Sequence, residues 1–102
     1  MSATLTVIYW RDIPAQVTAQ AGAASARVRL SDRFQNAIDA AAMKAGLTDS
    51  DAYLEEWRRV SRECGPELEA EVAAEVERLE AAFPREVLLP LTRSGGLRTA
   101  GS

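Results

Sequence analysis

The residue types that most often carry enzymatic chemistry are scarce in this sequence. It contains no histidine, and Cys64 is its single cysteine. General acid–base catalysis uses histidine more than any other side chain, and a nucleophilic serine or cysteine needs a base within reach. The Ser-His-Asp and Cys-His arrangements are therefore excluded. The usual ligand sets of zinc, iron–sulfur and haem sites are missing as well, so we expect neither a metal nor a cofactor.

Carboxylates and one thiol remain, and each has a structural interpretation. The neighbours Glu55 and Glu56 and the glutamates within residues 67–71 are expected on the solvated faces of amphipathic helices. Cys64 is expected at the C-terminal end of a helix, where the helix dipole disfavours a thiolate. The spacings of phosphate-binding and calcium-binding loops do not occur. The sequence thus predicts a protein that is not an enzyme.

One candidate for binding is the corner "YWRDIPAQV". Trp10, Arg11 and Asp12 end a run with strand character, and a change of direction is expected before Pro14. Tryptophan and arginine are favoured anchors at protein interfaces. We therefore predict a protein-binding patch made of Trp10, Arg11, Asp12 and Gln16. In the alternative interpretation, a stacked tryptophan and an Arg-Asp pair lock the turn.

A second candidate is the alternating run "ARVRL", which places Arg27 and Arg29 on one face of a strand. With a helix, a glycine-containing turn and another helix after it, this run is similar to the ribbon-helix-helix DNA-binding unit. The two arginines would then contact guanine edges or phosphates. The simpler interpretation makes them the polar face of a half-exposed strand. We expect nucleic acid to be the less favoured partner, because a preceding strand competes for the same edge and an acidic helix follows.

Composition and charge set limits on the class of protein. A chain of 102 residues with 47% apolar residues predicts one domain with a modest core. The net charge is -3, and residues 63–86 carry eight glutamates against two arginines. No apolar run approaches the roughly 18 residues of a membrane span, and no leader opens the chain. With one cysteine and no disulfide, we expect a cytoplasmic protein without membrane contact.

The elements that must position these residues change from a strand period to a helix period near Leu30. Strands are expected at residues 3–10, 14–22 and 26–30, the last two separated by the small-residue loop "AGAAS". A helix is expected from Asp32, which resembles a capping box with Gln35, to a left-handed cap at Gly46 with Leu47 beyond it.

Two further helices are expected. One begins at Thr48, with Asp51 three residues later, or at Ser50 alone. Its apolar stripe is Tyr53, Leu54, Trp57 and Val60. The turn Cys64-Gly65-Pro66 ends it and starts the next helix, which Pro84 stops. The stripe of that helix is Leu68, Val72, Val76, Leu79 and Phe83.

These elements predict an α+β fold, with a small antiparallel sheet of two to three strands packed against two to three helices. Residues 1–84 form the expected domain, and 85–102 are expected to be an extended apolar segment and a flexible C-terminal tail. Ile38, Met43, Leu54 and Trp57 are expected to pack on the sheet as core.

The segments "TVIYWRDIPAQV" and "RVRLSDRFQNAIDAAAMKAGLTDSDAYLEEWR" together resemble a small bacterial domain family called virulence factor. The resemblance covers roughly residues 5–60. It implies an accessory or interaction domain whose partner is another protein. Family members that stand alone often lie near genes for folate- and corrinoid-linked one-carbon metabolism, which implies assistance to a methyl-transfer system. A third hypothesis is an enzyme subunit that contributes Arg11 or Asp12 to an active site completed by a second chain.

Overall fold

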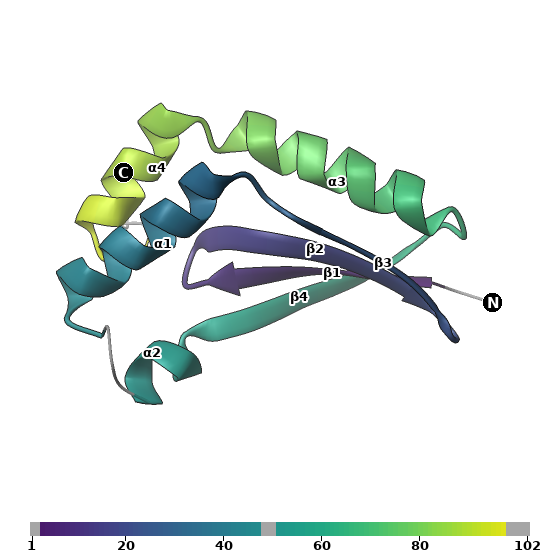
Figure 1. Ribbon diagram of the computed structural model, residues 1–102, viewed down its shortest axis with the longest axis horizontal. Coiled ribbons are helices and arrows are strands. Elements are labelled where there is room, and N and C mark those ends of the chain that lie inside the picture. The colour runs from purple at the N-terminus through teal and green to yellow at the C-terminus, as the bar shows by residue number, and fades with distance from the viewer. Residues whose placement is uncertain (1–2, 48–50, 98–102) are drawn as a thin grey trace.

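A four-stranded antiparallel sheet and four helices make up the part of the chain that the computed structural model describes, residues 3–47 and 51–97 (Figure 1). The strands are β1 (Ala3–Trp10), β2 (Ile13–Ala21), β3 (Ala24–Arg29) and β4 (Trp57–Cys64), in the spatial order β3-β2-β1-β4. The helices are α1 (Asp32–Ala45), α2 (Asp51–Glu55), α3 (Leu68–Ala82) and α4 (Arg85–Arg93). The predicted α+β class and the antiparallel sheet are confirmed, with more strands and helices than expected.

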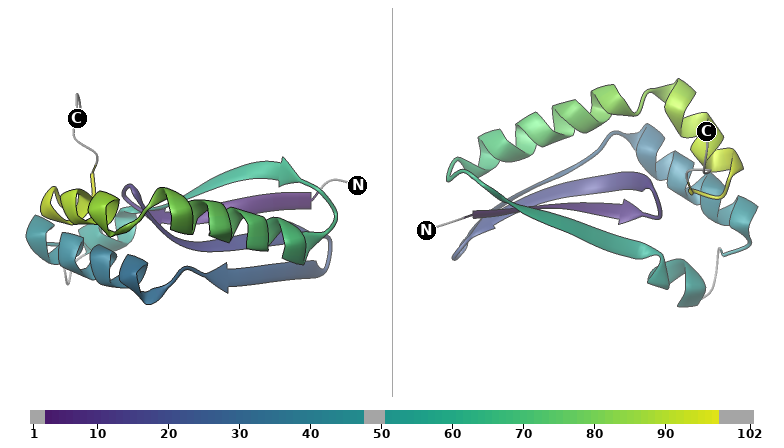
Figure 2. Two further views of the ribbon diagram at one scale, coloured as in Figure 1. Left: turned by 90° about the horizontal axis from the view of Figure 1, so that it is seen from above. Right: turned by 180° about the vertical axis from the view of Figure 1, so that it is seen from behind.

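Helices α1, α3 and α4 cover the sheet from one side, and α2 lies beside the start of β4 (Figure 1). Helix α3 packs on β2 and β3, while α1 and α4 pack together at the end of the sheet where β1 ends (Figure 2). The core therefore lies between this helical layer and one face of the sheet. None of the described helices is both long enough and apolar enough to cross a bilayer.

The alternation in β1 explains which face is covered. Leu5 and Val7 are buried, whereas Thr4, Thr6 and Ile8 on the other side are exposed or half-buried. Burying an aliphatic side chain of this size contributes about 1.5–3 kcal/mol, so this pattern sets the orientation of the strand. Other large buried side chains of the core include Val17 from β2, Phe34 and Ile38 from α1, Val72 and Leu79 from α3, and Leu88 and Leu91 from α4.

The prediction of a long second helix is wrong, and its expected start at Thr48 or Ser50 lies outside the described residues. Helix α2 ends at Glu55, and residues Trp57–Cys64 form β4, which pairs with β1 from Ala3↔Cys64 to Trp10↔Trp57. The run "WRRVSREC" fits either period locally, but β1 offers it a full ladder of backbone hydrogen bonds. The turn at Gly65 therefore joins a strand to a helix.

Because Trp57–Cys64 is a strand and not a helix, the expected core also differs from the observed one. Ile38 is fully buried and Trp57 packs partly against the core, as expected. Met43 and Leu54, however, are 70% and 63% exposed. Leu54 belongs to the apolar stripe of a long second helix that does not form, and Met43 lies on the exposed side of α1.

The expected extended segment after Pro84 is wrong as well. Residues Arg85–Arg93 form α4, with Pro84 as its N-cap and Pro90 inside it. An internal proline removes a helical hydrogen bond, but burial of Leu88 and Leu91 in the core supports the helix. Of the expected flexible tail, Gly95 and Gly96 are buried, and residues 98–102 lie outside the described part.

The ends of α1 agree in part with the sequence-based prediction. Gly46 adopts the expected left-handed conformation with φ 74°, and the amide of Leu47 donates to the carbonyl of Ala42 at 2.9 Å. The capping box at Asp32 is wrong, because Ser31 is the N-cap and both its amide and its hydroxyl bond to Glu80 of α3. The expected loop "AGAAS" is a shorter turn, and β3 already begins at Ala24.

A buried carboxylate links α3 to β4. The side chain of Glu75 is 5% exposed and pairs with Arg62 of β4 at 3.4 Å and with Arg78 of its own helix. Hydrogen bonding from Arg78 is the main reason why the pKa of Glu75 is lowered, against the opposing effect of burial. This ion cluster fastens the middle of α3 to β4, a strand that the helix otherwise barely contacts.

We predict that Glu75→Gln destabilises the protein at neutral pH by about 1–2 kcal/mol, because charge-assisted bonds to two arginines are lost. The contribution of a carboxylate whose folded pKa is lowered is present above its unfolded pKa and disappears as pH falls through the folded pKa. The difference between wild type and variant in urea unfolding should therefore shrink at acid pH. A difference that stays constant down to about pH 2 would contradict this assignment.

Candidate functional site

Trp10 lies at the meeting point of three segments that are distant in the sequence. Its side chain is fully buried. The indole N–H donates to the carbonyl of Tyr53 at 3.0 Å, and the two rings are 5.5 Å apart between centroids. On another side Gly96 approaches so closely that a Cβ there would lie 2.8 Å from Cζ3 of the indole. The tryptophan thus joins the end of β1 to α2 and to the residues after α4.

Arg11 holds the turn between β1 and β2. It has φ 53°, a left-handed conformation that costs a residue with a Cβ about 1 kcal/mol or more. Its Nε pairs with Glu56 at 2.6 Å, its Nη1 donates to the carbonyl of Gly95 at 3.0 Å, and its guanidinium lies 5.2 Å from the Trp10 ring centre. Its amide also donates to the carbonyl of Glu56. These bonds hold the strained residue in place.

Asp12 completes the same corner. Its amide donates to the carbonyl of Gly96 at 2.8 Å, and its carboxylate pairs with Arg58 of β4 at 3.3 Å. Arg58 also donates to the carbonyl of Arg11 and lies over the ring of Tyr9. Arg11 and Asp12 therefore tie the turn to β4 and to the residues after α4.

The contacts of the corner fit the turn-locking interpretation, with Arg11 paired to Glu56 and Asp12 to Arg58. The Trp10 side chain presents no surface to a partner in this structure. Both the contact role of Trp10, Arg11 and Asp12 and the hypothesis of a shared active site stay predictions. Gln16 does not join the corner, because its side chain lies on the uncovered face of the sheet.

The strand register shows what surrounds Gln16. Residues directly opposite one another on neighbouring strands point to the same face. Successive rows across the sheet are Arg29, Gln16, Ile8 and Arg59, then Arg27, Thr18, Thr6 and Ser61, then Ser25, Gln20, Thr4 and Glu63. We call these twelve residues the open face. A shallow hollow of about 370 Å³ lies on it, lined by residues of all four strands.

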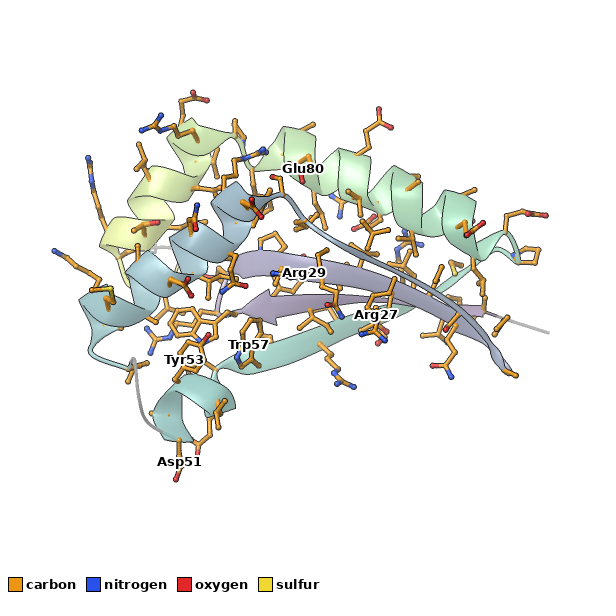
Figure 3. The ribbon with its side chains drawn as sticks, in the orientation of Figure 1. Arg27, Arg29, Asp51, Tyr53, Trp57 and Glu80 are labelled. Carbon is orange, nitrogen blue, oxygen red and sulfur yellow. The ribbon has the colours of Figure 1, made fainter. Side chains whose placement is uncertain are left out.

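The arginines of the open face differ from most others in the protein. Arg11, Arg33, Arg58, Arg62 and Arg78 each pair with a carboxylate. Within residues 3–47 and 51–97, no carboxylate oxygen lies within 4.0 Å of the guanidinium of Arg27, Arg29 or Arg59, and all three side chains are exposed. Figure 3 labels Arg27 and Arg29 on the strand below α3.

The open face is consequently basic within an acidic protein. Its three arginines and one glutamate give it a formal charge of +2, whereas the chain carries -3. Guanidinium, amide and hydroxyl groups donate hydrogen bonds to anions, and arginine does so in a bidentate manner with carboxylates and phosphates. The chemistry that this surface offers is therefore recognition of an anion. Among the described residues there is no cluster of three acidic or cysteine side chains arranged to hold a metal ion.

Sequence reasoning found three members of the open face and missed the arrangement. Arg27 and Arg29 were predicted as a pair, and Gln16 was assigned to the corner. Arg59 was missed because residues 51–60 have a plausible helical stripe. The local sequence gives no clear strand signal there, because the residues of β4 show no alternation between buried and exposed positions.

The predicted ribbon-helix-helix arrangement does not form. Strand β3 is paired along its length with β2 of the same sheet, and α1 is followed by the five-residue α2 and then by β4. The two arginines are thus presented by a four-stranded sheet instead of by a two-stranded ribbon.

We predict that Gly96→Ala destabilises the protein by about 2–4 kcal/mol, through left-handed strain and the clash with Trp10. Gly22→Ala is the matched control, because its φ is also positive and a Cβ there would meet nothing within 4 Å. It should cost only about 1 kcal/mol. Urea unfolding of both variants measures the difference, and equal losses would show that the contact with Trp10 is unimportant.

Known proteins resemble this chain at the level of a family. No curated protein and no solved structure matches the chain. A family model described as virulence factor matches residues 8–92, a range that contains the Trp10 corner, Gln16 and all three arginines of the open face. The match extends well beyond half of the 102 residues. The chain belongs to the virulence factor family.

Proposed function

We propose that this protein is a non-catalytic accessory domain that binds an acidic segment of another protein on its open face. The observation that carries the proposal is the gathering of three exposed arginines, none with a carboxylate partner among the described residues, on a sheet face that no described helix covers. Such arginines can form ion pairs with a partner without first breaking pairs within their own chain.

The neighbours of the arginines suit a protein partner. Gln16, Thr18 and Thr6 provide amide and hydroxyl groups between Arg27 and Arg29 on one side and Arg59 on the other. Ile8 is half-buried in the same row as Arg29 and Arg59 and adds an apolar contact. Interfaces of this kind combine polar hydrogen bonds with charge pairs that steer association.

Nucleic acid is the second candidate, and Arg27 and Arg29 favour it as well. Proteins that bind duplexes strongly neutralise about six to ten phosphates. The open face has three arginines, whereas α3 has the exposed glutamates Glu69 and Glu77 and the exposed N-cap Glu67. This balance of charge makes an acidic protein segment the better fit.

The family resemblance supports a partner from a folate- or corrinoid-linked methyl-transfer system. This part of the proposal depends on the resemblance alone. The charge of the open face favours an acidic partner over a basic one, but it does not select among acidic proteins. Identification of the captured protein is therefore part of the test.

We predict that Arg27→Glu/Arg59→Glu lowers capture of the partner from a native lysate at least about tenfold. Arg85→Glu/Arg93→Glu changes the charge equally on exposed residues of α4, outside the open face, and should leave capture unchanged. Circular dichroism establishes that both variants are folded, and mass spectrometry identifies the captured proteins.

Equal capture by the two variants would refute the open face as the binding surface. Capture that nuclease treatment abolishes would replace the protein partner with nucleic acid. A set of captured proteins that contains no methyl-transfer component would remove the proposed pathway and leave the binding surface in place.

A further inference from the structure

Strand β3 is an edge of the sheet, and its outer backbone groups are free. The amide of Leu30 donates to the carbonyl of Ala15 in β2 at 3.0 Å. Because backbone groups point to alternate sides along an antiparallel strand, the N–H and C=O of Ser25, Arg27 and Arg29 point away from β2. No described residue forms a hydrogen bond with these groups.

This edge has few of the features that prevent strand addition. Residues Ala24–Arg29 contain no proline, and their register with β2 is unbroken. Natural edge strands are commonly protected by prolines, bulges or charges. The protection at β3 consists of charge alone, from Arg27 and Arg29. A basic edge repels a second copy of itself, since arginines would stand opposite arginines, but it attracts an acidic strand.

The side chains of β3 define what an added strand should carry. Arg27 and Arg29 point to the open face, and Val28 between them lies on the other face, where it is 43% exposed. At the other edge of the sheet, Arg58 and Arg62 of β4 already pair with Asp12 and Glu75. Of the two edges, β3 therefore has both of its arginines available to a partner, whereas β4 has only Arg59 of its three.

We propose that the acidic segment of the partner binds as a fifth strand beside β3. Its carboxylates occupy alternate positions opposite Arg27 and Arg29, and an apolar side chain between them packs over Val28. This inference depends on the proposed function, because it specifies how the acidic partner binds. Main-chain hydrogen bonds to Ser25, Arg27 and Arg29 supply affinity, and the alternation of acidic and apolar side chains supplies specificity.

The test uses the full chain and synthetic peptides of alternating glutamate and valine. A control peptide has the same composition with the glutamates grouped together. Two further peptides carry N-methyl groups on either the glutamate or the valine amides. In an antiparallel addition the glutamates opposite Arg27 and Arg29 exchange hydrogen bonds with them, whereas in a parallel addition the valine amides do so.

We expect the alternating peptide to bind at least about tenfold more tightly than the grouped one. One of the two N-methylated peptides should lose about tenfold in affinity, and which one it is reports the strand direction. The amides of Ser25, Arg27 and Arg29 should become protected from hydrogen exchange. Arg27→Gln/Arg29→Gln should weaken binding, and Arg85→Gln/Arg93→Gln should not.

Equal binding of all four peptides would overturn strand addition, because charge alone would then account for the affinity. Absence of peptide binding to the wild-type chain would overturn it as well. In either case the lysate experiment with Arg27→Glu/Arg59→Glu decides separately whether the open face binds a partner. Tight binding of single-stranded oligonucleotides in place of the peptides would contradict both proposals.

Discussion

Strand β4 pairs with β1 along eight residues, and most other features of the protein depend on this pairing. It makes β1 an interior strand, so that the apolar alternation of Leu5 and Val7 faces a single core. It ends α2 after five residues and brings Tyr53 against Trp10. It also adds Arg59 to the row that contains Gln16 and Arg29. Without β4, the chain would lack the closed corner, and the open face would lack Arg59.

Charge is divided between the two sides of the sheet. On the helical side, Glu75 is buried between Arg62 and Arg78, and Ser31 and Arg33 bond to Glu80, so these groups are used within the fold. On the open side, the arginines have no such partners among the described residues. Ion pairs within the chain fasten α3 to the sheet, whereas the free arginines are available for recognition. An overall acidic protein can in this way present one basic surface.

The corner at Trp10 and the open face are connected through the strands. Arg11 and Asp12 bond to Glu56, Gly95, Gly96 and Arg58, and thereby join the β1–β2 turn to β4 and to the end of α4. Because these contacts position the strands whose alternate residues form the open face, a change at the corner is expected to act on binding through the fold. Variants of the corner therefore report on the fold, whereas variants of the open face report on binding.

The sequence by itself determined the strands at residues 3–10 and 14–22, the third strand with its outward arginines, the helix ending at Gly46 and the helix stopped by Pro84. These depend on local periodicity, on glycine and on proline, whose effects act within a few residues. Only the tertiary structure decided that Trp57–Cys64 is a strand, that residues after Pro84 form a helix, and that Gln16, Arg27, Arg29 and Arg59 share one face. Each of these depends on a partner distant in the sequence: β1 for β4, the core for Leu88 and Leu91, and the strand register for the open face. A local pattern carries no information about such partners, because the free energy that selects them comes from backbone pairing and burial between distant segments.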